Sequence, residues 1–399
     1  MKSIKVSLFS FAVLISYFTL IATSHAHSTP KHHPKHKPNP HVILPKPIEP
    51  PKIQLAILLD TSGSMDGLID QTRNQLWQVV NEFSTAKRNG ITPVLEVALF
   101  EYGNDGNSRD TGFVRMLNNF TRELDKVSEG LFSLTTNGGS EYCGFAIKTA
   151  IHSLNWSHSD RDIKSIFIAG NEPFTQGPVN YRHALRLANQ HGIVVNTIHA
   201  GDHQVGIDTG WQSGALVAGG DYMSIDANRK AVHILAPQDK RIAELNQELN
   251  KTYIPYGKQG RVKAERQKEQ DKRSENISSA LLAKRVQSKS SSYYNNSKWD
   301  LVDAIRDGEI AEEELILMEE SALPEAMKKM SSEEKKSYVA AKTKARKEIK
   351  EEIKKLSQSR DKFVAQKKRA LVSQAPDMSE ALTKAIKKQA EKKNYQFEN

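Results

Sequence analysis

The chain has one cysteine among its 399 residues, Cys143, and this excludes an intrachain disulfide. A eukaryotic secreted domain of this size would usually carry disulfides, so the bacterial periplasm fits better if the chain is exported. The sequence also lacks a Gly-x-x-x-x-Gly-Lys motif, so no nucleotide site is indicated. Apolar residues make up only 38% and the mean hydropathy is −0.57, so part of the chain is not expected to form packed core.

Charge is spread unevenly along the chain. Residues 52–256 hold 18 Lys and Arg against 22 Asp and Glu, a net charge of −4. Residues 257–399 hold 33 against 24, a net charge of +9, and residues 1–51 hold 6 against 1, a net charge of +5. We therefore predict an acidic domain over 52–256 that is flanked by two basic segments.

The first basic segment has the features of an export signal and a linker. Lys2 and Lys5 precede an apolar run over 6–22, and Ser24-His25-Ala26 is a small-x-small cleavage site, so 1–26 is predicted to be a signal peptide. No cysteine follows the run, which argues against a lipoprotein. Residues 27–51 are rich in Pro, His and Lys and are interpreted as a solvated tether, with transition-metal binding as the alternative. The expected location is periplasmic or secreted.

Residues 52–256 alternate between strand and helix patterns, which is typical of a doubly wound, mostly parallel α/β sheet with helices on both faces. The stretch Ile53–Met65 is the clearest example. Its apolar run 55–59 is bounded by prolines before it and by Gly63 after it, as expected for a fully buried parallel strand. The strands are expected at 53–59, 93–100, 113–117 (antiparallel), 163–169, 193–199 and 222–225, and the helices at 68–88, 142–154, 181–191 and 211–217.

Three oxygen-bearing side chains follow the first strand. Asp60, Ser62 and Ser64 lie two residues apart on the turn, at the carboxyl end of the strand, where open α/β sheets bind their ligands. One carboxylate and two hydroxyls are hard oxygen donors, and these suit Mg²⁺, Mn²⁺ or Ca²⁺ better than Zn²⁺. The alternative is a strand-end turn in which the same side chains bond only to backbone groups.

This Asp-x-Ser-x-Ser motif resembles the metal-ion-dependent adhesion site of von Willebrand factor A domains. The resemblance implies that two serines and a threonine from a second loop bind the metal, and that aspartates of the first and third loops hold it mostly through water. It also implies an open coordination position that a partner protein fills, often with a carboxylate. The order of strands and helices over 52–256 matches that domain.

The other two loops decide how far the resemblance extends. In the second loop, Ser140 stands where the family has its threonine, and Glu141 is an acidic candidate beside it. The third loop departs from the family's Thr-Asp-Gly, because Gly170 occupies the aspartate position and only Asn171 and Glu172 can substitute. Asparagine would remove one negative charge, which should weaken affinity for the cation.

The resulting prediction is a protein that binds a partner's acidic residue through a divalent metal ion and breaks no bond. One alternative is a hydrolase that uses metal-bound water, with His199 or Glu172 as its base. The other is a structural scaffold with a degenerate metal site. A contact between the basic segment 257–399 and an anionic envelope surface is also expected, whereas the export signal argues against nucleic acid as a partner.

Residues 257–399 are predicted to be a charged, helical tail. Residues 258–292 are polar and are expected to be poorly ordered or a loose helix. Ser331 and Glu334 form a capping box, which predicts a long helix to about residue 372, and a last helix is expected at 378–393. The apolar seam of the long helix is thin and matches a coiled coil only in part.

Overall fold

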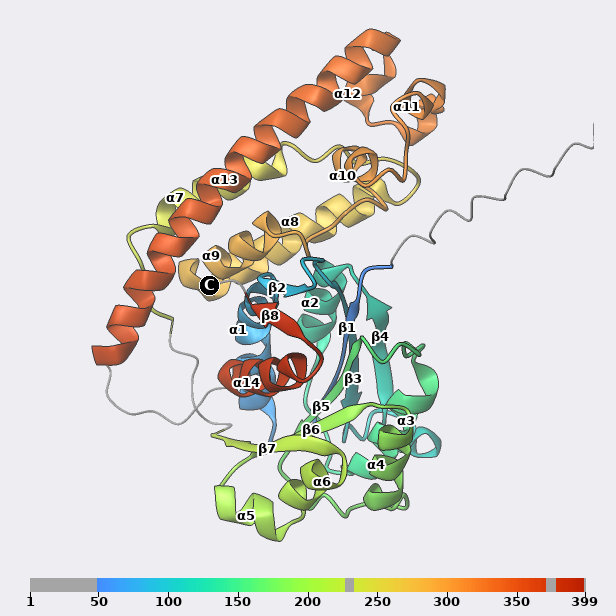
Figure 1. Cartoon of the computed structure of the whole chain (residues 1–399), viewed down its shortest axis with the longest axis vertical. Coiled ribbons are helices and arrows are strands. Elements are labelled where there is room, and N and C mark those ends of the chain that lie inside the picture. The colour runs from blue at the N-terminus through green and yellow to red at the C-terminus, as the bar shows by residue number, and fades with distance from the viewer. Residues whose placement is uncertain (1–48, 227–232, 371–377, 398–399) are drawn as a thin grey trace, which may run out of the picture. The chain divides into compact units, whose positions relative to one another are not determined.

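The computed structural model describes residues 49–226, 233–370 and 378–397 (Figure 1). The predicted signal peptide over 1–26 and most of the predicted linker over 27–51 lie outside the described residues. Residues from Glu49 onward form one unit. Within the described ranges, no helix combines the length and the apolar character that crossing a membrane requires.

A mixed six-stranded sheet organises the first half of the chain. Its order is β4-β3-β1-β5-β6-β7, and all neighbours are parallel except β3 and β4. β1 therefore lies between β3 and β5. Both of its faces are covered, which explains why its sequence carries apolar side chains at consecutive positions. The strands are β1 (Lys52–Asp60), β3 (Val94–Tyr102), β4 (Arg115–Thr121), β5 (Ile163–Gly170), β6 (Val194–Ala200) and β7 (Gly219–Ile225).

Helices cover both faces of this sheet, and the side chains of β1 alternate between them. Leu55 and Ile57 join the core beneath α1, α2 and α14 (Met378–Glu391), whereas Ala56 and Leu58 join the core beneath α3, α4 and α6. The helices between β1 and β7 are α1 (Asp66–Phe83), α2 (Leu124–Ser133), α3 (Cys143–Ser153), α4 (Tyr181–Gln190), α5 (His203–Asp208) and α6 (Trp211–Val217), with a short 3-10 helix, η1 (Arg109–Thr111).

The end of the chain returns to this sheet. α14 (Met378–Glu391) packs beside α1 and against β5 and β7, as the red and blue ribbons of Figure 1 show. After α14, β8 (Tyr395–Phe397) pairs antiparallel with β2 (Ala86–Arg88). The domain boundaries given by the sequence stay predictions, but the last helix of the basic region contributes to the core of the α/β domain.

Between β7 and α14 the chain forms a layer of helices on α1 and α2. α8 contacts α2, α9 contacts α1, and the long α13 contacts α7 and α9. The helices of this region are α7 (Asp239–Asn250), α8 (Gly260–Ile277), α9 (Ser279–Ser290), α10 (Leu301–Arg306), α11 (Glu314–Leu317), α12 (Glu325–Lys328) and α13 (Ser332–Ala370), with the 3-10 helix η2 (Glu320–Ala322).

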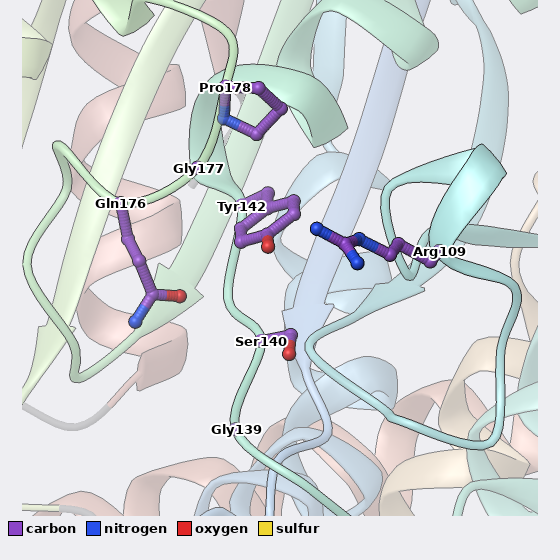
Figure 2. A pocket seen from close by; sticks show the side chains of 7 residues that line it. All are labelled: Arg109, Gly139, Ser140, Tyr142, Gln176, Gly177 and Pro178. Carbon is purple, nitrogen blue, oxygen red and sulfur yellow. The ribbon is translucent and has the colours of Figure 1, made fainter.

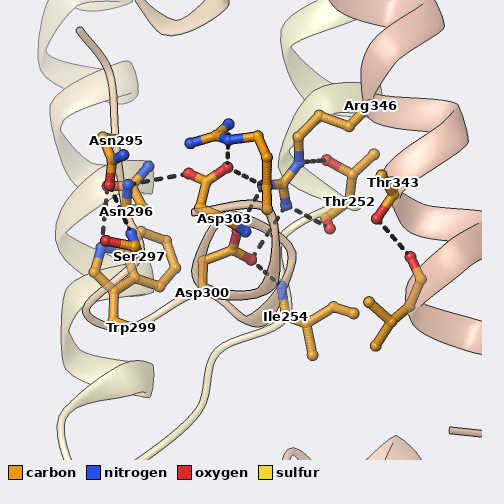
Figure 3. Close-up of polar contacts among 12 residues, drawn as sticks. Thr252, Ile254, Asn295, Asn296, Ser297, Trp299, Asp300, Asp303, Thr343 and Arg346 are labelled. Carbon is orange, nitrogen blue, oxygen red and sulfur yellow. Dashed lines mark hydrogen bonds and ion pairs between the residues drawn. The ribbon is translucent and has the colours of Figure 1, made fainter. Parts of the chain in front are cut away.

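Buried ion pairs fix α13 to this layer. The guanidinium of Arg346 donates to Asp300 Oδ2 (2.5 Å), to Asp303 Oδ1 (3.0 Å) and to the backbone oxygen of Thr252 (2.7 Å), as drawn in Figure 3. Its face lies 4.2 Å from the ring centroid of Tyr253. A buried arginine is tolerated because each polar group finds an oppositely charged or hydrogen-bonding partner.

The α/β fold class with a helical C-terminal region is confirmed. The capping box is also confirmed, since Ser331 N donates to Glu334 Oε2 (2.7 Å) and Glu334 N donates to Ser331 Oγ (3.3 Å). For residues 258–292, the expectation of a poorly ordered segment is wrong, and the alternative expectation of a loose helix agrees with the structure in being helical. That segment forms α8 and α9, which pack together through charged side chains that are buried rather than solvated.

Candidate functional site

The first site loop begins where β1 ends. Asp60 is 0% exposed, and its Oδ1 accepts a hydrogen bond from Ser62 N at 2.8 Å. This bond turns the chain so that the hydroxyls of Ser62 and Ser64 come within 3.5 Å of each other. Among the described residues, no group donates a hydrogen bond to the buried Oδ2 of Asp60. A buried carboxylate oxygen without a partner is costly, and a bound cation would remove that cost.

The second loop is joined to the first by backbone hydrogen bonds. Asn137 N donates to the oxygen of Thr61 (2.9 Å), and Gly63 N donates to the oxygen of Gly138 (2.9 Å). Ser140 then forms a β-bridge with Gly103, just beyond β3. These contacts bring the second loop to the edge of the sheet at which β1 and β3 end.

Gly103 leaves room for the two carboxyl groups of the site. A Cβ atom at this position would lie 2.7 Å from Asp60 Oδ1 and 2.9 Å from Glu141 Cγ, and its φ of +81° also favours glycine. The absence of a side chain therefore lets Asp60 and Glu141 approach each other. Glu141 is only 3% exposed, so its carboxyl group belongs to the interior of the site.

The third loop reaches the first through Asn171. Its Nδ2 donates to Ser64 Oγ at 3.1 Å, and its Oδ1 is buried with no hydrogen-bond partner among the described residues. Glu172 is exposed, and its backbone N donates to Glu141 Oε2 at 3.3 Å. Asn171 thus lies within the site through its side chain, whereas Glu172 contacts it through its backbone.

Tyr102 explains why no side chain stands at Gly170. A Cβ there would lie 2.4 Å from the hydroxyl of Tyr102 and 3.0 Å from Asp60 Oδ2. That hydroxyl is fixed by donating to the oxygen of Ala169 at 2.9 Å. An aspartate at position 170 is therefore incompatible with Tyr102 in this place, and the neighbouring Asn171 supplies the polar group of the loop.

The pKa values of the two acidic side chains of the site are shifted by burial and by their contact with each other. Burial raises the pKa of Glu141 to about 9, and the adjacent Asp60 carboxyl adds to the effect. Burial also raises the pKa of Asp60, whereas its contact with the Glu141 carboxyl group and the hydrogen bonds from Ser62 lower that pKa. Two buried carboxylates in contact can avoid repulsion only by sharing a proton or by binding a cation between them.

The donor set fits a hard divalent cation better than a transition metal. It consists of two carboxyl groups, the serine hydroxyls and the amide oxygen of Asn171, all of them oxygen ligands. In the part of the chain that the structure describes, no three His, Cys, Asp or Glu side chains gather into a metal site. The site therefore depends on hydroxyl and amide oxygens for any further coordination.

The remaining predicted residues lie at the margin of the site or outside it. The side chain of Ser140 is half-buried and lines a pocket beside the loops. His199 is 2% exposed, and its ring packs against Trp211 with 5.7 Å between the ring centroids. Burial lowers its pKa, which favours the neutral ring. Tyr102 and Gly103 were not predicted as site residues, although both follow shortly after the predicted second strand, at the same sheet edge as Asp60.

Substituting Gly170 with alanine tests the crowding at this loop. We expect Gly170→Ala to lower the free energy of unfolding by about 1–3 kcal/mol, because the new methyl group overlaps the fixed Tyr102 hydroxyl. Gly139→Ala is the matched control, since no atom lies within 4 Å of its added Cβ. Urea unfolding of both variants measures the difference. Equal midpoints for the two variants would show that Tyr102 moves aside freely.

No family model and no curated protein matches the sequence. Solved structures similar to it include the VWA domain of SpRpn10, with 16% identity over 44% of this chain and 88% of that one, at a TM-score of 0.33. BatB from Bacteroides thetaiotaomicron is 15% identical over 44% of this chain and 90% of that one, at a TM-score of 0.34. Proximal thread matrix protein 1 from the mussel byssus, with a zinc-occupied MIDAS motif, is 11% identical over 45% of this chain and 43% of that one, at a TM-score of 0.34. The match thus spans less than half of the mussel protein.

Proposed function

We propose that this chain is an exported binding protein that holds Mg²⁺, Mn²⁺ or Ca²⁺ at Asp60 and uses it to bind an acidic residue of a protein partner. The observation that carries the proposal is the buried Asp60 Oδ2, which has no hydrogen-bond partner among the described residues and lies beside a second buried carboxyl group. A bound divalent cation would neutralise that pair and offer an open position to an incoming carboxylate.

Each loop has a defined task in this proposal. Asp60 and Glu141 supply negative charge, and Ser62 and Ser64 supply neutral oxygens. Asn171, which contacts Ser64, supplies an amide oxygen where the related domains have a carboxylate. The missing charge leaves the cation more attractive to a partner's carboxylate. The same change is expected to weaken binding of the cation when no partner is present.

Calorimetric titration of Mg²⁺, Mn²⁺ and Ca²⁺ into the purified chain tests the proposal. We expect saturable binding in the wild type and its loss in Asp60→Asn, because the amide removes the charge that a hard cation requires. Asp208→Asn is the matched control, since Asp208 is an exposed carboxylate that bonds to Gln204 Nε2 (3.0 Å) and lies outside the site. Absence of binding in the wild type, or equal binding in Asp60→Asn, would contradict the proposal.

A further inference from the structure

A pocket opens beside the site, on the outer side of Ser140. Its volume is about 510 Å³, within the usual range for ligand pockets. Three segments form it: the loop with η1, the second site loop, and the chain that follows the third site loop (Figure 2). The lining residues are Arg109, Gly139, Ser140, Tyr142, Gln176, Gly177 and Pro178.

The lining residues favour an anion. None of them carries a carboxylate, and Arg109 is exposed, with no ion pair to its side chain among the described residues. In Figure 2, the guanidinium of Arg109 points toward Tyr142 and Ser140 from one side, and Gln176 stands on the other. Gln176 Oε1 accepts from Glu141 N at 2.5 Å, which leaves the amide NH₂ as the free end of this side chain.

The walls of the pocket are fixed by packing. The Tyr142 ring lies edge-to-face against Phe113, with 5.5 Å between centroids. It also lies directly over Gly177, where a Cβ would come within 2.5 Å of Tyr142 Cγ. Arg109 begins a short 3-10 helix that is capped at its start by Ser108 and followed by Gly112. A pre-formed pocket loses little conformational entropy when a ligand enters it.

We propose that this pocket binds a second carboxylate of the same partner segment whose first carboxylate is bound at the metal site. Ser140 lines the pocket and the next residue, Glu141, contributes its carboxyl group to the site, so one short acidic segment can reach both places. A single guanidinium matches a carboxylate, to which it can donate two parallel hydrogen bonds. This inference rests on the proposed function and narrows it to partners with two acidic groups close together in the chain.

A series of dicarboxylates tests the inference without knowledge of the natural partner. Succinate, glutarate, adipate and pimelate are titrated into the Mn²⁺-loaded chain and compared with butyrate, which carries one carboxylate. We expect one chain length to bind at least about tenfold more tightly than butyrate, because the second contact becomes intramolecular once the first is made. Arg109→Gln should lower the affinity for that dicarboxylate to the affinity for butyrate. It should leave the affinity for butyrate unchanged.

Two comparisons keep this inference separate from the proposed function. Arg261→Gln is the matched control, since Arg261 is an exposed arginine on α8. This substitution should change neither the affinity for the preferred dicarboxylate nor the affinity for butyrate. The inference is overturned if every dicarboxylate binds like butyrate, or if Arg109→Gln binds the preferred dicarboxylate as the wild type does. The proposed function survives either result as long as Mn²⁺ still binds to the wild type and not to Asp60→Asn.

Discussion

Truncation of the chain after Ala370 is expected to abolish the cooperative unfolding of the α/β domain. The removed segment includes α14, whose Leu382 and Ile386 are buried against α1 and the sheet, and Tyr395 of β8. Each large apolar side chain contributes about 1.5–3 kcal/mol when fully buried. The sum is comparable with the total stability of an ordinary domain, about 5–15 kcal/mol.

Polar contacts make α14 specific to this place on the sheet. Gln389 Oε1 accepts from Ser165 Oγ (3.1 Å) on β5, and Gln389 Nε2 donates to Asn196 Oδ1 (3.1 Å) on β6. Asn196 Nδ2 donates in turn to Ser165 Oγ at 2.9 Å, so three buried polar side chains satisfy one another. Without α14, the Ser165 and Asn196 side chains would each lose one of these partners, at a further cost in free energy.

Urea unfolding followed by tryptophan fluorescence measures the effect, because Trp77, Trp156 and Trp211 all lie in the α/β domain. A milder variant, Ile386→Ala, should lose about 2–5 kcal/mol of unfolding free energy. Lys384→Ala, on the exposed face of the same helix, should stay within about 0.5 kcal/mol of the wild type. A truncated chain that unfolds with the wild-type midpoint and slope would show that α14 is dispensable.

The α/β half of the fold could be predicted because its signals are local. The run Ile53–Leu59 specifies a buried parallel strand, and a short apolar run followed by a turn identifies the edge at which the first site loop lies. The place of α14 could not be predicted in this way. Its apolar side chains indicate an amphipathic helix. The sequence around Leu382 and Ile386 does not indicate that they pack against the sheet, whose strands lie more than 150 residues earlier in the chain.

The site was predicted in the same uneven way. Asp60, Ser62 and Ser64 form a local motif, so their clustering follows from one turn. The positions of Tyr102 and Gly103 depend on the pairing of β3 with β1, and neither is a residue type that a search for metal ligands selects. The charged residues of α8 and α9 were not predicted to be buried, for a related reason. The sequence shows which residues are charged, but it does not show whether two of them form an ion pair in the interior or lie in solvent.

Removal of the Asp271 carboxylate is expected to cost about 3–5 kcal/mol of unfolding free energy, because it leaves the buried Lys289 without its counter-ion and the buried Arg285 with Asp125 alone. Asp271 Oδ1 accepts from Arg285 Nε at 2.7 Å, and Oδ2 accepts from Lys289 Nζ at 2.8 Å. Arg285 also donates to Asp125 Oδ1 on α2 (2.7 Å) and lies 4.7 Å from the ring centroid of Trp77 on α1. This cluster therefore joins the helical layer to the α/β domain.

The test compares Asp271→Ala with Glu275→Ala by urea unfolding. Glu275 is an exposed carboxylate one turn further along α8, so its removal should change the unfolding free energy by less than about 0.5 kcal/mol. A loss of less than about 1 kcal/mol in Asp271→Ala would contradict the expectation. It would mean that Asn246 and Asn250, which donate to Asp271 and accept from Lys289, compensate for the missing charge.

The pH dependence of the same cluster gives a second measurement. Burial alone would raise the pKa of Asp271, but the Lys289 ammonium and the Arg285 guanidinium outweigh burial and hold it well below its usual range. Asp125 and Tyr294 also face Arg285.

A carboxyl group with a depressed folded-state pKa stabilises the fold above its unfolded pKa of about 3.9, and this stability is lost as the pH falls. The difference in unfolding free energy between the wild type and Asp271→Asn should therefore shrink by about 1 kcal/mol between pH 7 and pH 3. A constant difference would show that Asp271 acts through packing and hydrogen bonds rather than through its charge.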